Sequence, residues 1–312
     1  MAKLKIKRQA DFDFSESQLP HNRTEVFFDC LKLRWRTFLQ LGLLFFFAML
    51  PIFVVNIVRD NMIADAIYNG NSLLNARYTL LVFDAINIPF YLIAAIAFSA
   101  AFRVIRNIAW GEAVFFKEDT KDGIKLNWKV FSIVFVLIGT DVFFVDFIIQ
   151  CTTIDIVKGI PIGILIMLLL PIAILIIVQA TIYKIGFFGA LKNACYLFAK
   201  SVWKSLLCAI VTALPILFLL IPNSIIRNIC LAVYMMFFMP YVCLGVFLCG
   251  CSVLDKYINA HSHPEIVDKG VNRVKNETEA NEVASSEKEE TDEIDCSENE
   301  NVDNQTKENE ER

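Results

Sequence analysis

Six long apolar blocks constrain this chain more than any other feature. They cover about residues 38–58, 79–102, 130–150, 159–182, 206–221 and 229–250, and the fifth is the shortest. A nearly uncharged run of about 18 or more residues can cross the hydrocarbon core of a bilayer as a helix. The composition agrees, since 56% of the residues are hydrophobic, whereas a soluble globular chain averages about 45–50%.

These blocks predict helices rather than strands, because a lone segment in lipid must satisfy its own backbone hydrogen bonds. A membrane β-barrel would show alternating segments of about 10 residues, and the run from Ile164 to Leu170 does not alternate. We therefore expect an all-α polytopic membrane protein. Residues 25–255 would form a six-helix transmembrane domain, preceded by an N-terminal segment, 1–24, and followed by an acidic tail, 256–312.

Similar short basic segments, which we call lead-ins, precede alternate apolar blocks. The segments Asp29–Trp35 and Asp122–Trp128 both read Asp-x-x-Lys-Leu-x-Trp, and Gly189–Asn193, with Trp203 further on, is a looser relative. The three lead-ins precede the first, third and fifth blocks. This repetition predicts three similar helical hairpins, each entered from the same side of the membrane.

Charge between the blocks predicts the orientation. The N-terminal segment, the 103–129 and 183–205 loops and the tail together carry 25 Lys and Arg residues, whereas the other three loops carry 4. Positive charge stays on the cytoplasmic side, so we expect both termini to be cytoplasmic. Residues 255–312 hold 18 acidic and 7 basic residues. From about Val267 this tail is too polar to bury enough surface to fold, so we expect it to be disordered.

Three carboxylates inside the blocks are the first candidates for function. They are Asp84, Asp141 and Asp146, and Asn87 lies one turn from Asp84. Charged residues inside membrane spans are costly and mark functional sites by default. With the expected orientation, all four residues form a candidate polar site in the outer half of the membrane. The alternative is a set of ion pairs with Arg59, Arg77 and Arg227 near the same boundary.

Aromatic and basic residues between the blocks form a second candidate surface, of lipid-interface or docking type. It comprises Trp35, Arg103, Arg106, Trp110, Glu112 and Trp128. Such clusters suit the inner headgroup layer, where each basic residue gains about 1 kcal/mol from anionic lipid. The residues could equally bind a soluble partner. The segment from Glu25 to Trp35 is either an interfacial helix or the first turns of the first span.

Several enzyme signatures are absent from the sequence. It has no phosphate-binding Gly-rich loop, no Gly-x-Ser-x-Gly elbow, no His-Glu-x-x-His and no Cys-x-x-Cys. We therefore expect a non-enzymatic protein with no cofactor, no metal and no nucleic-acid partner.

Short motifs at the lead-ins suggest a family. The segments Phe28–Lys32, Gly123–Trp128 and Ala190–Asn193 resemble those of the YesL-type family of small bacterial membrane proteins of unknown function. The resemblance covers about residues 25–255, and the long acidic tail departs from it. It implies a bacterial cytoplasmic membrane protein that accompanies carbohydrate uptake systems, and it carries no catalytic residues over.

Three functional hypotheses follow, of which an intramembrane enzyme, with no set of residues to suggest it, ranks last. The leading one is an accessory or scaffold protein of the membrane, linked to carbohydrate or other solute uptake, whose partners are the bilayer and a membrane transport complex or a second copy. The alternative is a small transporter or channel that uses the buried carboxylates.

Overall fold

The computed structural model describes residues 20–68, 73–151, 155–221 and 223–271. Within these ranges the chain is all-helical, with 90% of residues in helices and no strand. The expected helical class is therefore confirmed. The disorder expected for the tail concerns residues that lie, from 272 onward, outside the described ranges.

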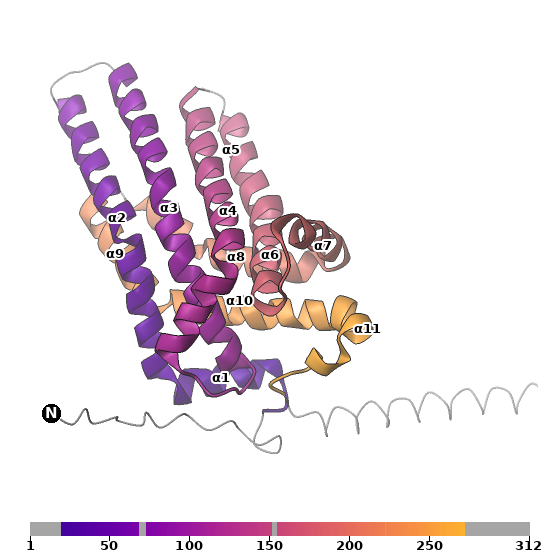
Figure 1. The fold of residues 1–312 in the computed structure, drawn as a ribbon. Coiled ribbons are helices and arrows are strands. Elements are labelled where there is room, and N and C mark those ends of the chain that lie inside the picture. The colour runs from indigo at the N-terminus through magenta and orange to yellow at the C-terminus, as the bar shows by residue number, and fades with distance from the viewer. Residues whose placement is uncertain (1–19, 69–72, 152–154, 222, 272–312) are drawn as a thin grey trace, which may run out of the picture.

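Four long helical stretches run side by side and form the body of the molecule (Figure 1). They are α2 (Trp35–Tyr68), α3 (Leu73–Ala109), α4 (Phe116–Cys151) and a composite of α5 (Asp155–Ile164), the π-helical turn η2 (Leu165–Leu169) and α6 (Leu170–Ile182). Two antiparallel hairpins result, α2 with α3 and α4 with α5–α6, and α3 also packs closely on α4.

The remaining helices are shorter and surround this body. They are α1 (Arg23–Leu33), α7 (Phe187–Lys200), α8 (Val202–Ala213), the 3₁₀ helix η3 (Leu214–Leu220), α9 (Ser224–Phe237), α10 (Met239–Leu254), η4 (Asp255–Asn259), α11 (Ala260–Ser262) and η5 (Pro264–Ile266). We call the end of the body that carries α1 and residues 255–271 the terminal end.

Five stretches within the described ranges are long and apolar enough to cross a membrane. They are Trp35–Asp65, Tyr78–Ala109, Phe116–Ile149, Val157–Ile182 and Met239–Asn259. A sixth is counted if Phe187–Lys200 and Val202–Phe218, which are bent by 108° at their junction, form one span. This set has the length and composition of a multi-pass membrane protein.

The last two apolar blocks differ from simple spans. In the block expected at 206–221, α8 ends at Ala213 and Pro215 lies in the first turn of the 3₁₀ helix η3. In the block expected at 229–250, α9 ends at Phe237 and Pro240 lies in the first turn of α10. Proline removes a backbone donor and clashes with the preceding turn, so it favours a new helix start over continuation. The third hairpin therefore does not repeat the first two.

Helix α10 is the most enclosed of the membrane-length helices. Of its apolar stretch, 56% is buried inside the molecule, compared with 17–33% for the other four. It runs across the row of long helices (Figure 1) and contacts α1, α2, α3, α6, α8 and α9. At Gly250 a Cβ atom would lie 2.8 Å from a methyl group of Val178, so the two helices α10 and α6 meet at a residue without a side chain.

We expect Gly42→Ala to destabilise the contact between α2 and α9. An alanine Cβ would lie 1.7 Å from the carbonyl oxygen of Met236, and overpacking of this kind costs about 1–3 kcal/mol. Thermal unfolding in detergent should show a lower midpoint. The matched control is Gly163→Ala, whose Cβ would meet nothing within 4 Å. Equal midpoints for Gly42→Ala and the unmodified protein would contradict the close approach of the two helices.

Candidate functional site

A buried polar cluster forms where α2, α3, α4 and α9 meet. On α2, Arg59 and Asp60 follow Asn56 by three and four residues, so the three side chains share one face of the helix. On α3, Asn87 and Tyr91 follow Asp84 by three and seven residues and so also share one face, and α4 contributes Gly139 and Asp146, seven residues apart. Each helix therefore presents a polar stripe to the same interior space.

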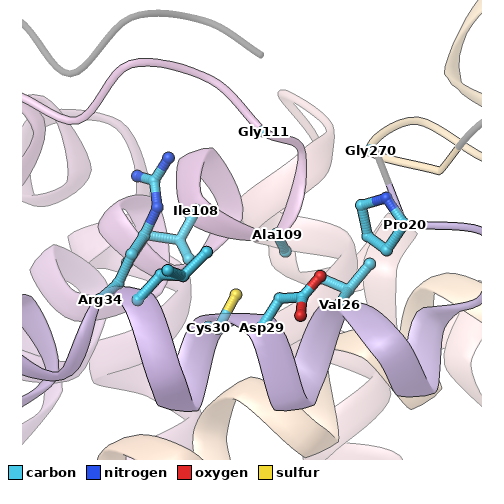
Figure 2. Close-up of a pocket in the computed structure, with 10 residues that line it drawn as sticks. Pro20, Val26, Asp29, Cys30, Arg34, Ile108, Ala109, Gly111 and Gly270 are labelled. Carbon is cyan, nitrogen blue, oxygen red and sulfur yellow. The ribbon is translucent and has the colours of Figure 1, made fainter. Parts of the chain in front are cut away.

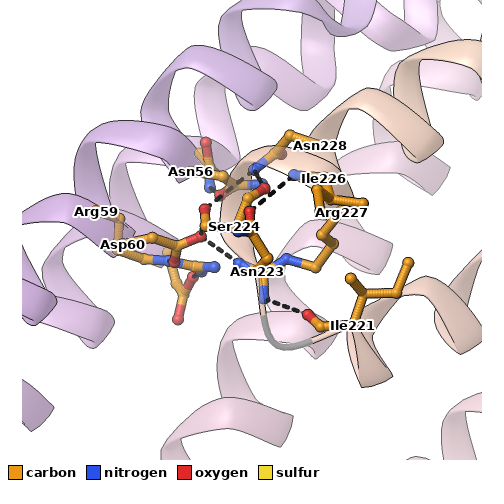
Figure 3. A network of polar contacts seen from close by, with 11 residues as sticks. Asn56, Arg59, Asp60, Ile221, Asn223, Ser224, Ile226, Arg227 and Asn228 are labelled. Carbon is orange, nitrogen blue, oxygen red and sulfur yellow. Dashed lines mark hydrogen bonds and ion pairs between the residues drawn. The ribbon is translucent and has the colours of Figure 1, made fainter.

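A chain of ion pairs links three of these helices. Arg59 donates from Nη1 to Asp84 Oδ1 at 2.9 Å and from Nε to Asp60 Oδ1 at 3.2 Å. Asp60 also accepts from Arg227 on α9 and from the Ser224 hydroxyl at 2.6 Å (Figure 3). The order Asp84–Arg59–Asp60–Arg227 thus connects α3 through α2 to α9.

Helix α9 begins in a way that places Arg227 beside Asp60. The side chain of Asn223 caps the helix by accepting a hydrogen bond from the Ile226 backbone N–H at 3.1 Å, as Figure 3 shows. Ser224 and Arg227 then lie three residues apart on one face. Asn228 donates to the Ser224 carbonyl oxygen at 2.9 Å and orders this first turn.

A cavity of about 380 Å³ lies against the ion pairs. Charged and polar side chains from four helices line it: Asn56, Arg59, Asp84, Asn87, Tyr91, Asp146 and Arg227. The side chain of Asp146 interacts directly with that of Asp84. Asn87 donates from Nδ2 to Asn56 Oδ1 at 3.0 Å. Two buried oxygens, Asp84 Oδ2 and Asn87 Oδ1, have no hydrogen-bond partner.

The charges of this cluster do not balance. Among the described side chains the network holds two arginines, Arg59 and Arg227, and three carboxylates, Asp60, Asp84 and Asp146. If every group is ionised, one negative charge is left over. Such an excess inside an apolar bundle is costly unless something positive compensates it. No group of three or more His, Cys, Asp and Glu side chains suited to a metal ion occurs in the described part of the chain.

The structure separates the four intramembrane residues proposed from the sequence. It brings Asp84, Asn87 and Asp146 to one cavity, whereas Asp141 does not line it and has a buried, unpartnered Oδ2 of its own. Asp141 and Asp146 are five residues apart, which turns them by roughly 140° on a helix. The ion pairs suggested for Arg59 and Arg227 are present, and the side chain of Arg77 lies outside the described residues.

Sequence reasoning missed Asn56, Asp60 and Ser224. Asn56, Arg59 and Asp60 carry a readable signal, because three polar residues at helical spacing close the first apolar block. Ser224 carried no such signal, because its role depends on where α9 packs against α2.

We expect Asp60→Asn to lower the stability of the protein. Asp60 is the shared anion between Arg59 and Arg227, and removing one partner of a buried ion pair typically costs about 3–5 kcal/mol. The midpoint of thermal unfolding in detergent should fall. Asp65→Asn removes the same charge from an exposed position on α2 and should leave the midpoint unchanged. Similar midpoints for the two variants would show that Asp60 does not hold the network together.

A second cluster lies at the terminal end, around the loop that follows α3. Arg106 Cζ lies 4.5 Å from the centroid of the Trp110 ring, and Lys269 Nζ lies 4.3 Å from it. Lys269 also pairs with Glu112 at 2.7 Å, and Arg106 approaches Glu112 at 3.6 Å. Two residues proposed as a docking surface, Trp110 and Glu112, are therefore engaged by the chain's own residue 269.

The segment that carries Lys269 is held on the loop by Gly270. Gly270 has a φ of 90°, and a Cβ there would lie 2.2 Å from the carbonyl oxygen of Ala109. Gly270, Ala109 and Gly111, labelled in Figure 2, all line a small cavity, whose volume is about 70 Å³. Cys30 of α1 lines the same cavity, and burial raises the pKa of its thiol to about 11, so the thiol is neutral at physiological pH.

The other proposed surface residues lie apart from this contact. Trp35 and Trp128 are 52% and 44% exposed, with Arg36 Cζ and Lys129 Nζ at 5.6 and 6.0 Å from the respective ring centroids. Arg103 instead has a buried Nε without a hydrogen-bond partner. Only Arg106, Trp110 and Glu112 of the proposed docking residues meet in one cluster.

We expect Gly270→Ala to release residues 264–271 from the loop after α3. A left-handed conformation costs a non-glycine residue about 1–2 kcal/mol, before the clash with Ala109 is counted. Cleavage after Lys269 by a Lys-specific protease should become roughly tenfold faster, since cleavage follows the population of the open segment. Gly245→Ala is the control, because its Cβ would make only an ordinary contact at 3.8 Å with Phe27. An unchanged cleavage rate in Gly270→Ala would exclude the close contact.

In comparisons with known proteins, no protein-family model, curated protein or solved structure matches the chain. The resemblance to the YesL-type family therefore stays a prediction from the lead-in motifs.

Proposed function

We propose that this chain is a multi-pass protein of the bacterial cytoplasmic membrane with both termini in the cytoplasm. The five or six membrane-length helices support the multi-pass arrangement. The distribution of 25 against 4 basic residues between alternate loops supports the orientation. The bacterial assignment rests on the YesL-type lead-in motifs. In this orientation the terminal end is cytoplasmic and the polar cavity lies in the outer half of the membrane.

We further propose that the protein is a small transporter or channel for a small polar or charged solute, which it binds in this cavity. The observation that supports this best is the side chain of Asp84, which is 6% exposed and presents an unpartnered oxygen to a cavity of about 380 Å³. Unsatisfied carboxylates in membrane helices are expensive. A bound solute would compensate this cost.

The accessory or scaffold role linked to solute uptake is the second candidate. Exposed Trp128 and Trp203, the latter 86% exposed, favour it, because they offer aromatic surface outside the buried core. Against it, Trp110 and Glu112 are already engaged by Lys269. Affinity purification from the native membrane in mild detergent separates the roles, because an accessory protein brings down transporter subunits in near-equal amounts. Neither role includes catalysis, since the sequence has none of the enzyme signatures named above.

We expect Asp84→Asn to abolish solute flux in reconstituted vesicles. The variant keeps the size of the side chain but removes the charge that pairs with Arg59 and faces the cavity. Fluxes of Na⁺, K⁺, protons and simple sugars would be followed for the unmodified protein and the variant. Asp141→Asn is the matched control, because it neutralises a membrane carboxylate that does not line the cavity. Equal fluxes in all three proteins would refute the transport role of this site.

A further inference from the structure

Two buried hydrogen-bond acceptors of the cavity are free. Asp84 Oδ2 and Asn87 Oδ1 have no partner, and each of these side chains is only 6% exposed. They lie one turn apart on α3, so they point to the same side of the helix. Both line the cavity, as does the carboxylate of Asp146, which interacts with Asp84.

Three of the side chains that line the cavity donate hydrogen bonds within the polar cluster. Arg59 donates to Asp84 Oδ1 and to Asp60, and the amide of Asn87 donates to Asn56. Arg227 donates to Asp60 and to the Ile221 carbonyl oxygen at 3.5 Å. A ligand that completes the site therefore needs to offer positive charge or hydrogen-bond donors to these two oxygen atoms.

The charge count sets the valence of that ligand. When all five groups are ionised, two arginines face three carboxylates, so a single positive charge makes the described network neutral, whereas a divalent ion would leave an excess of one positive charge. Carboxylate and amide oxygens are the ligands that hard cations prefer. Oxygen groups inside membrane proteins bind alkali cations by replacing part of their hydration shell.

We propose that the cavity binds one monovalent cation, of the Na⁺ class, through Asp84 Oδ2, Asn87 Oδ1 and the carboxylate of Asp146. This inference rests on the proposed transport function and names the charge class of the solute or coupling ion. The cavity is larger than one ion, since a water molecule occupies about 30 Å³ in the liquid. The cation therefore enters with part of its water shell.

Equilibrium binding of ²²Na⁺ to the purified full-length protein in detergent tests the site without requiring flux. Ionic strength would be held constant with N-methyl-D-glucamine. We expect saturable binding of about one Na⁺ per chain, as the charge count requires. Asn87→Ala should weaken binding by about tenfold or more, as the loss of a ligand group typically does. Asp84→Asn should abolish binding, and Asp141→Asn should leave it unchanged.

If Asp84→Asn does not fold, the site is tested with Asn87→Ala. The Asn87→Ala substitution changes no charge and removes only the hydrogen bond to Asn56. Displacement of ²²Na⁺ by K⁺ would support the monovalent class. Stronger displacement by Ca²⁺ at equal concentration would overturn it. Thermal stability that responds to pH but not to Na⁺ would show that a proton occupies the site and would also overturn the inference.

The outcomes separate this inference from the transport role. Flux that depends on Asp84 without any ²²Na⁺ or K⁺ binding would refute the cation site and leave transport standing. Binding that depends on Asp84, with vesicle fluxes unaffected by Asp84→Asn, would establish the site and refute transport.

Discussion

The ion-pair chain Asp84–Arg59–Asp60–Arg227 holds α2, α3 and α9 together in the part of the molecule away from the terminal end. Long helices such as α2 and α3 could slide or rotate against one another if only apolar side chains met between them. The ion pair between Arg59 of α2 and Asp84 of α3 restricts both the rotation and the height of α2 relative to α3. Because Asp60 is shared with Arg227, the same network fixes where the short helix α9 begins.

At the terminal end, a different set of polar contacts joins the helices to one another. The buried helix α10 continues into η4, where Asp255 pairs with Arg23 at the start of α1 and accepts from Asn259 at 2.6 Å. Tyr183, just after α6, donates to Asn259. The end of α10 is thus held to α1 and α6 by polar groups, while its middle is held by close apolar contacts such as Gly250 against Val178. Residues 264–271 then return to the loop after α3 through Lys269 and Gly270.

The sequence predicted the helical class and the first four membrane-length helices because long apolar runs are a local property. It did not predict the division of the last two blocks, because Pro215 and Pro240 resemble Pro51 and Pro89, which lie inside continuous helices. For the site, a separation of five residues turns Asp141 and Asp146 to different sides of any helix. It did not indicate that Asp146 is the one that meets Asp84, because this depends on how α4 is rotated against α3. Orientation and family stay predictions.

Asp146 is the residue that sets the charge of the cluster, and its side chain interacts with that of Asp84. Without it, Arg59 and Arg227 would balance Asp60 and Asp84, and the four groups would already join α2, α3 and α9. Asp146 adds a third carboxylate against Asp84 and makes no ion pair with either arginine in the described network. Repulsion between two neighbouring carboxylates in an apolar bundle opposes folding. A chain selected only for stability would place an apolar residue or an amide there. Its presence beside an unpartnered oxygen of Asp84 is what a site that exchanges a positive charge requires.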